Sequence, residues 1–203
     1  MVDKVLRVPK EKVLAPIATH LAPRIHPTTI TLIAFGFGLV ASGAVWQRAY
    51  GLGVSLWLIN RVLDGLDGTV ARLNGKQSDL GGYIDVVLDH VIYATLPIAL
   101  VLAQPSVAAW LSLTALLSSF YINGASWMFL AALLEKRRAG ASAQGELTTI
   151  TMPGGLIEGT ETVVFYALFL LFPGATTLLF SLMAVLVFTT IVQRLVWALR
   201  HLQ

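Results

Sequence analysis

The sequence predicts an all-α integral membrane protein in which six transmembrane helices follow an N-terminal amphipathic interfacial helix. The first observation is composition: 56% of the 203 residues are hydrophobic and only 12% are charged, whereas a typical soluble domain is about 25% charged. The second is a series of long apolar segments, and the third is the placement of Lys and Arg at their ends. The length fits one domain over residues 1–203, with an interfacial segment at 1–25 and a six-helix bundle at 26–199.

A helix needs roughly 20 predominantly apolar residues to cross a bilayer. Six segments are candidates: Thr28–Trp46, Leu52–Leu63 with its continuation toward Arg72, Gly82–Ala103, Val107–Leu134, Gly154–Phe172 and Thr176–Leu199. Turn-forming residues separate several of them, for example Pro105 and the pair Pro173 and Gly174.

The positions of the 14 Lys and Arg residues predict the orientation. If the N-terminus is cytosolic, Arg48 lies in an outer loop, Arg61 lies within the second helix, and the others fall on the cytosolic side. Because Lys and Arg accumulate in cytosolic loops, we expect both termini in the cytosol. We expect a multi-pass protein of a bacterial or archaeal cell membrane.

The segment Val2–Leu21 mixes charged and apolar residues and contains Pro9 and Pro16. Its basic, amphipathic character favours a helix on the cytosolic membrane surface, and a flexible tail is the alternative. The basic residues of the chain do not form a face interleaved with aromatics, so no nucleic-acid partner is expected. The absence of cysteine excludes disulfides, thiolate metal sites and Cys nucleophiles.

Four aspartates lie where the chain should be in or near the bilayer: Asp64, Asp67, Asp85 and Asp89. Ionised groups are costly there, so they indicate function. The first two are three residues apart and the last two are four apart, so each pair shares a helix face. The short loop Leu73–Leu80 should make the two helices antiparallel neighbours, so the pairs can face each other. Carboxylates in this number suit Mg²⁺, Mn²⁺ or Ca²⁺, and two such ions could clamp a pyrophosphate.

The pattern Asp64-x-x-Asp67-Gly68-x-x-Ala71-Arg72, eight residues, then Gly81-x-x-x-Asp85-x-x-x-Asp89 resembles the signature of the CDP-alcohol phosphotransferase (CDP-alcohol phosphatidyltransferase) family. All of its fixed positions match, and the six-helix outline extends the resemblance to nearly the whole chain. The segment His26–Thr31 looks like the family's Pro-x-x-x-Thr element, although many relatives have Asn where Thr28 stands.

The resemblance implies a role for each matching residue. Asp64, Asp67 and Asp85 would be the main ligands of Mg²⁺ or Mn²⁺, with two ions in the site, and Asp89 would be the general base near or on the second metal. The residues implied to bind the CDP moiety are Asp64, Gly68, Ala71, Arg72, Ser78, Gly81, Thr28 and Thr31.

The resemblance also implies the reaction. A phosphatidyl group would pass by direct displacement from a CDP-linked lipid donor, CDP-diacylglycerol, to a small alcohol acceptor, with release of CMP at the cytosolic side. A CDP-linked small alcohol with a lipid acceptor is the runner-up. Family members are commonly dimers, so a homodimer surrounded by membrane lipids is expected.

Three further residues are candidates for an acceptor pocket: Glu158, Glu161 and Arg61. Arg61 could bind a phosphorylated acceptor. The two glutamates could shape the pocket, or they could be a solvated helix start, where acids are favourable.

Two other functions remain open at this point. An intramembrane prenyltransferase also holds a diphosphate with aspartates, but it usually has two separate Asp-rich motifs in a longer chain. A divalent-cation transporter should have acids along a path through the membrane. Here the motif acids cluster near one face, and transport gives Arg72 no purpose.

Overall fold

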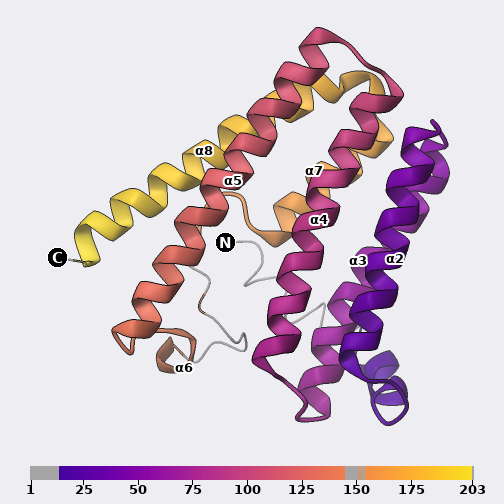
Figure 1. Cartoon of the computed structure of the whole chain (residues 1–203). Coiled ribbons are helices and arrows are strands. Elements are labelled where there is room, and N and C mark those ends of the chain that lie inside the picture. The colour runs from indigo at the N-terminus through magenta and orange to yellow at the C-terminus, as the bar shows by residue number, and fades with distance from the viewer. Residues whose placement is uncertain (1–13, 145–150, 152–153, 203) are drawn as a thin grey trace.

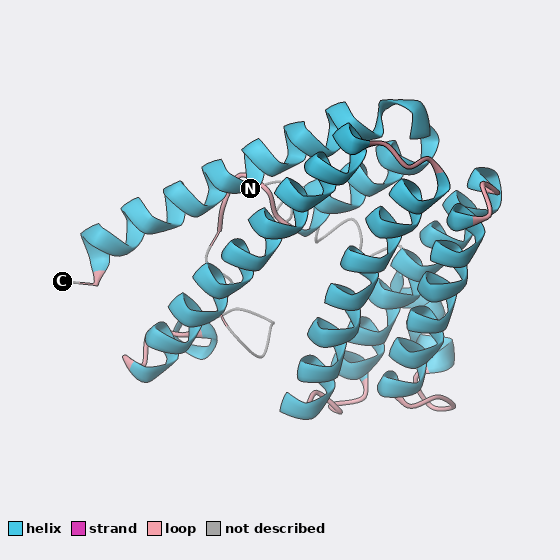
Figure 2. Ribbon diagram, turned by 45° about the horizontal axis from the view of Figure 1, so that its top comes forward, coloured by secondary structure: helices cyan, strands magenta, loops and turns pink. Residues whose placement is uncertain are grey.

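The computed structural model describes residues 14–144, 151 and 154–202, and every regular element within them is a helix (Figures 1 and 2). Residues 14–21 are helical and precede the rest. The later elements are α2 (Pro27–Trp46), α3 (Tyr50–Leu73), α4 (Asp79–Ala103), α5 (Val107–Lys136), α6 (Ala141–Gln144), α7 (Gly159–Leu171), the 3₁₀ turn η1 (Pro173–Ala175) and α8 (Thr176–His201).

Among the described residues, four helical segments are long and apolar enough to cross a membrane: α2, α4, α5, and η1 together with α8. The helix α3 has 24 residues, about 36 Å, but the acidic motif and two arginines interrupt its apolar sequence. The helix α7 has 13 residues, about 20 Å, against a hydrocarbon core of about 30 Å. The all-helical fold is confirmed, and the count of six spans stays a prediction for α3 and α7.

Two helix starts differ from those expected by three residues or more, and capping explains both. The fifth segment was expected from Gly154, but α7 begins at Gly159, because Glu158 adopts an extended backbone and forms a capping box with Glu161. The third was expected from Gly82, but α4 begins at Asp79 because the Ser78 hydroxyl accepts a hydrogen bond from the Gly81 amide at 3.1 Å.

The expected interfacial helix Val2–Leu21 is described only in its second half, and residues 1–13 lie outside the described residues. Within the described half, Leu14 and Ala18 are buried in a cluster that includes Leu66 and Val70 of α3. The side chain of Asn74 donates to the Ala22 carbonyl at 2.6 Å. This part of the segment therefore packs against the end of the bundle, and its place at a membrane surface stays a prediction.

The helix α2 packs against both α3 and α4, while α5 pairs with α8 and α7 contacts α3 and α8. Figures 1 and 2 show α4 and α5 meeting at their connecting loop and diverging toward their other ends. Two glycines permit the close approach of α2 to its neighbours. A Cβ on Gly38 would lie 2.7 Å from Ile92 Cδ1 of α4, and one on Gly53 would lie 2.6 Å from Val45 Cγ2.

A buried cluster of aromatic side chains lies between α3, α4 and α7. Trp57 of α3 stacks on Tyr166 of α7 with ring centroids 5.3 Å apart, and Tyr93 of α4 meets Tyr166 edge-on, also at 5.3 Å. The Tyr166 hydroxyl donates to the Tyr93 carbonyl at 2.5 Å. These contacts join α3, α4 and α7 next to the acidic motif.

Candidate active site

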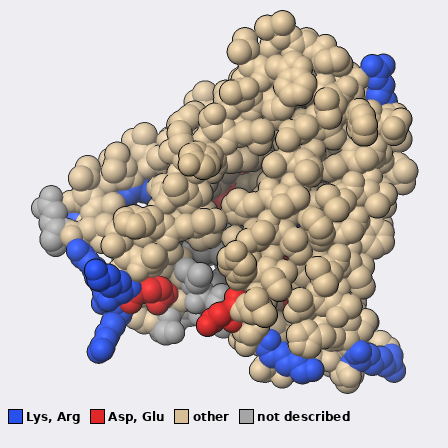
Figure 3. Space-filling view, in the orientation of Figure 1, with Lys and Arg blue, Asp and Glu red and all other residues tan. Residues whose placement is uncertain are grey.

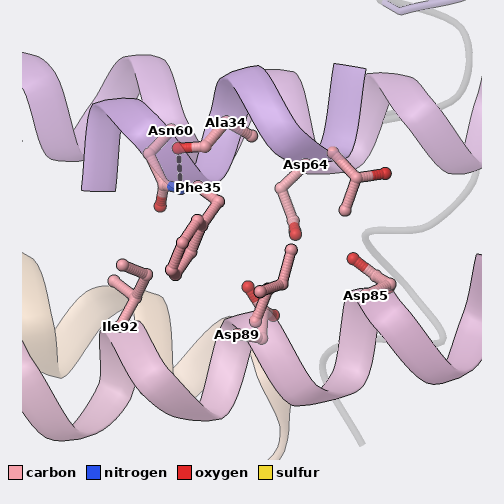
Figure 4. A pocket seen from close by; sticks show the side chains of 9 residues that line it. Ala34, Phe35, Asn60, Asp64, Asp85, Asp89 and Ile92 are labelled. Carbon is pink, nitrogen blue, oxygen red and sulfur yellow. Dashed lines mark hydrogen bonds between the residues drawn. The ribbon is translucent and has the colours of Figure 1, made fainter. Parts of the chain in front are cut away.

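Three of the motif aspartates line one small cavity between α3 and α4. Asp64 comes from α3, and Asp85 and Asp89 come from α4. Figure 4 shows the three carboxylates directed into the space between the helices. The cavity is completed by Thr31, Ala34, Phe35, Asn60, Leu88 and Ile92. Asp64 therefore faces Asp85 and Asp89 across the cavity. The two helices were expected to be direct neighbours, but α3 and α4 make few contacts with each other, and both pack on α2 instead.

The fourth aspartate, Asp67, lies beside this cavity and is held by α2. Asp67 is only 6% exposed, and Thr31 Oγ1 donates to its Oδ2 at 2.5 Å. Asp67 also interacts electrostatically with Asp85. Thr31 lines the cavity and binds Asp67, so it connects the fourth carboxylate to the other three.

Asp89 is bound by a buried arginine on the opposite helix. Arg61 Nη2 lies 2.7 Å from Asp89 Oδ1, and Arg61 Nη1 lies 3.2 Å from Asp89 Oδ2. The same Nη1 is 3.6 Å from Asp64 Oδ2. This forked pairing is the geometry in which a guanidinium binds a carboxylate most strongly. Arg61 is not among the residues that line the cavity.

The carboxylate cluster is chemically suited to a hard divalent cation. Asp85 Oδ1 is buried and has no hydrogen-bond partner within the described part of the chain, an arrangement that is costly for a polar atom. In the present side-chain positions, no three acidic or imidazole groups of the described residues lie close enough together to hold one ion. The carboxylates nevertheless provide the oxygen ligands that Mg²⁺ and Mn²⁺ prefer. A bound cation would give the buried Asp85 oxygen an interaction partner.

The remaining motif residues of α3 lie toward its C-terminal end. Arg72 Nη2 donates to Thr69 Oγ1 at 3.2 Å, and a Cβ on Gly68 would lie 3.3 Å from Arg72 Nη1. The Arg72 side chain therefore lies close over Gly68. Ala71 and Arg72 are half-buried, and neither lines the cavity.

The other residues expected at the CDP site lie at helix starts. Ser78 is exposed and caps α4 through the Gly81 amide. Thr28 is half-buried in the first turn of α2. Like Ala71 and Arg72, these three lie outside the lining of the cavity.

The expected acceptor residues occupy two different places. Glu158 and Glu161 form the capping box of α7: the Glu158 side chain accepts from the Glu161 amide, and the Glu158 amide donates to Glu161 Oε2 at 3.1 Å. The Gly155 amide also donates to Glu158 Oε1 at 3.0 Å. They do not line the cavity between α3 and α4. Arg61, the third candidate, is buried against Asp89.

Several cavity and support residues were missed at the sequence level. Asn60 is four residues before Asp64, and Tyr93 is four residues after Asp89, so helical spacing already placed each on the face of its aspartate. Phe35 and Ile92 are apolar residues in apolar helices, and the sequence offered no signal that would select them.

Comparison with known proteins relates the chain to one enzyme family. The sequence pattern of the CDP-alcohol phosphatidyltransferase family matches residues 24–200. Inner membrane protein YnjF of Escherichia coli is 36% identical over 151 residues, which are 74% of this chain and 72% of that one. Archaetidylinositol phosphate synthase of Pyrococcus horikoshii is 26% identical over 180 residues, 88% of this chain and 86% of that one.

The fold is also similar to that of a solved protein, Mycobacterium tuberculosis phosphatidylinositol phosphate synthase. Its structure with CDP-DAG bound has a TM-score of 0.64 at 20% identity, covering 91% of this chain and 92% of that one. A second structure of the same protein, in complex with manganese and citrate, also has a TM-score of 0.64 at 20% identity, covering 90% and 87% of the two chains.

Proposed function

The chain belongs to the CDP-alcohol phosphatidyltransferase family, whose members are transferases of substituted phosphate groups, and from that premise we propose that it moves a phosphatidyl group from CDP-diacylglycerol to a small alcohol. CMP is the second product. The observation that carries the proposal is the cluster of carboxylates between α3 and α4, with Asp85 Oδ1 buried and unpaired within the described residues. The CDP-DAG complex of the mycobacterial synthase supports the choice of donor.

Asp64, Asp67, Asp85 and Asp89 would hold two divalent ions, Mg²⁺ or Mn²⁺. Such ions, when bound, supply positive charge against the pyrophosphate of the donor. The manganese complex of the mycobacterial synthase supports a metal in this fold. Thr31 keeps Asp67 oriented toward the cluster through its 2.5 Å hydrogen bond.

Asp89 takes the proton of the acceptor hydroxyl. The acceptor oxygen then forms a bond to the phosphorus nearer the diacylglycerol, and the bond from that phosphorus to the oxygen of CMP breaks with its electron pair. Each carboxylate oxygen has two acceptor sites, so the two hydrogen bonds from Arg61 leave Asp89 able to accept this proton.

The donor is held at the ends of α2, α3 and α4. Arg72 places its guanidinium near the departing phosphate, where planar donors match phosphate oxygens. Gly68 and Gly81 leave room for the nucleotide beside the helix backbones. Contacts from Asp64, Ala71, Ser78, Thr28 and Thr31 complete the site for the CDP moiety.

The acceptor enters the cavity beside Asp89, on the side of that carboxylate that Arg61 does not occupy. Glu158 and Glu161 remain candidates for its outer wall, although both side chains already cap α7. The enzyme would act from the cytosolic side as a homodimer.

Release of CMP by the detergent-purified protein tests the proposal. The assay supplies CDP-diacylglycerol, Mg²⁺ or Mn²⁺, and one acceptor at a time from a panel of glycerol 3-phosphate, inositol phosphate, serine and other small alcohols. Asp89→Asn is the inactivating variant. Asp79→Asn is the matched control, since Asp79 is an exposed acid at the start of α4 outside the motif.

We expect metal-dependent CMP release that needs one acceptor, disappears in Asp89→Asn and persists in Asp79→Asn. Release only from a CDP-linked small alcohol with a lipid acceptor would favour the runner-up reaction. If the metal binds but CDP does not, the carboxylates do not serve phosphoryl transfer, and the transporter hypothesis takes its place. If neither binds, the proposed function is wrong.

A further inference from the structure

We propose that Arg61 is a positioning residue that fixes the orientation of the Asp89 carboxylate. Its positive charge also lies at the carboxylate cluster and opposes the binding of divalent ions there. The inference rests on the proposed function and concerns a residue outside the matched signature. Arg61 acts through Asp89, because it contacts that side chain without lining the cavity.

The first argument is that Arg61 is held on every side. It is 9% exposed, and its Nε donates to Asn60 Oδ1 at 2.8 Å. Asn60 is itself fixed, because its Nδ2 donates to the Ala34 carbonyl at 2.7 Å. The guanidinium carbon lies 4.6 Å from the ring centre of Trp57 and 5.4 Å from that of Tyr93. Such a guanidinium cannot swing away with each turnover, as a flexible surface arginine could.

The second argument is the direction of its hydrogen bonds. Two nitrogens of Arg61 contact the two oxygens of Asp89, and Nη1 also donates to the Tyr93 hydroxyl at 3.0 Å. A forked contact fixes the plane of a carboxylate as well as its position. A lysine, which carries a compact charge, would fix the position alone.

The third argument is charge. Four aspartates surround the site, and Arg61 lies 2.7 Å from Asp89 and 3.6 Å from Asp64. Its positive charge stabilises the cluster before metal is bound. The same charge repels a divalent ion at those carboxylates, because two positive charges in a low-dielectric site repel each other over several ångströms.

Two variants separate the charge of Arg61 from its forked geometry. Arg61→Gln removes the charge, and we expect it to bind Mn²⁺ about tenfold more tightly while kcat falls at least about tenfold. Arg61→Lys keeps the charge, so its Mn²⁺ affinity should stay within about threefold of wild type. Its kcat should lie between those of wild type and Arg61→Gln, with the donor KM unchanged in both variants.

The experiment measures the Mn²⁺ dissociation constant of the full chain in detergent by the electron paramagnetic resonance of free Mn²⁺, without substrate. CMP release is measured separately. Arg194→Met is the control for metal affinity, because Arg194 is another buried arginine, bound at 2.5 Å to Asn123 of α5. It should bind Mn²⁺ as the wild type does.

Unchanged or weaker Mn²⁺ binding by Arg61→Gln would overturn the inference, and so would equal tightening in Arg61→Lys. If Arg61→Gln does not fold, Arg61→Lys decides: a wild-type kcat in it would overturn the role in positioning. A wild-type protein that binds no Mn²⁺ would overturn the proposed function itself, which distinguishes the two failures.

Discussion

A single hydrogen bond from Thr31 positions Asp67, one of the acidic side chains of the site. The sequence pattern suggested that Thr31 contacts the donor. In the structure its hydroxyl donates to Asp67 Oδ2 at 2.5 Å, and it also lies 3.2 Å from the Pro27 carbonyl. The threonine therefore links α2 to the acidic motif of α3.

Replacing Thr31 by Val should lower kcat about tenfold, because a hydrogen bond to a charged group contributes about 1.5–3 kcal/mol. Thr31→Ser should retain most of the activity, since it keeps the hydroxyl. The control is Thr189→Val, which removes an exposed hydroxyl bonded to the Val185 carbonyl of its own helix. Steady-state CMP release measures all three. Equal activity of Thr31→Val and wild type would show that Asp67 needs no support from α2.

At the residue scale, the sequence predicted where the acidic side chains lie but not which side chains they pair with. The spacing of Asp64, Asp67, Asp85 and Asp89 places each pair on one helix face whatever the tertiary structure. The pairing of Arg61 with Asp89 depends on how α3 and α4 are rotated toward each other. That rotation is set by their common packing on α2, which no spacing along one helix encodes.

At the scale of elements, the start of α4 has both a structural and a proposed functional role. Ser78 caps the helix by accepting from the Gly81 amide at 3.1 Å. Ser106 caps α5 in the same way, by accepting from the Ala109 amide at 3.1 Å. Variants of Ser78 and Ser106 can therefore distinguish the loss of a helix cap from the loss of a contact with the donor.

Ser78→Ala and Ser106→Ala should each lose about 1 kcal/mol of stability, seen as similar drops in Tm. Only Ser78→Ala should also raise the KM for CDP-diacylglycerol, because Ser106 lies at the far end of α4. A donor KM that rises equally in both variants would mean that the effect comes from lost helix stability and not from a contact with the donor.

The approach of α2 to α4 is a second feature of this scale. A Cβ on Gly38 would lie 2.7 Å from Ile92 Cδ1 and 3.2 Å from Asn60 Nδ2, both residues of the cavity, whereas a Cβ on Gly36 would meet nothing within 4 Å.

We expect Gly38→Ala to lower Tm and activity, since overpacking typically costs about 1–3 kcal/mol. Gly36→Ala on the same helix should be neutral or slightly stabilising, because Ala favours a helix over Gly. Thermal unfolding and CMP release measure both variants. A Gly38→Ala protein as stable as Gly36→Ala would show that α2 and α4 have room to separate.

The sequence predicted the long helices well, because their apolar runs and flanking turns are local features. It missed the start of α7, where the capping box of Glu158 and Glu161 overrides the apolar signal of Gly154–Ile157. The divergence of α5 from α4 also could not be predicted, because it depends on which side chains fill the space between distant segments.

At the scale of the whole molecule, the charged residues gather at one end. Figure 3 shows Lys and Arg side chains along the lower margin, acidic side chains at a hollow between them, and a broad uncharged surface above, with a further basic group at the upper end. The last turns of α3 and α5 contain Arg72 and Lys136. Arg48 lies in the opposite connection and donates to the Ala103 carbonyl at 2.9 Å.

The chain contains no cysteine, so single cysteines can report its orientation. In intact cells, a membrane-impermeant maleimide should label Arg48→Cys but not Lys76→Cys, and permeabilised cells should show labelling of both. The reason is that Lys and Arg accumulate on the cytosolic side. The reverse pattern would place the acidic site on the outer face, away from a cytosolic supply of CDP-linked donor.

The most direct test of the central claim is the anomalous scattering of Mn²⁺ in crystals of this protein grown with Mn²⁺ and CDP. We predict anomalous peaks between α3 and α4, within coordination distance of Asp64, Asp67, Asp85 and Asp89, with the phosphates of CDP beside them. Bound CDP without a peak at these carboxylates, or Mn²⁺ found only elsewhere, would contradict the claim that the four aspartates form the metal centre of the transfer reaction.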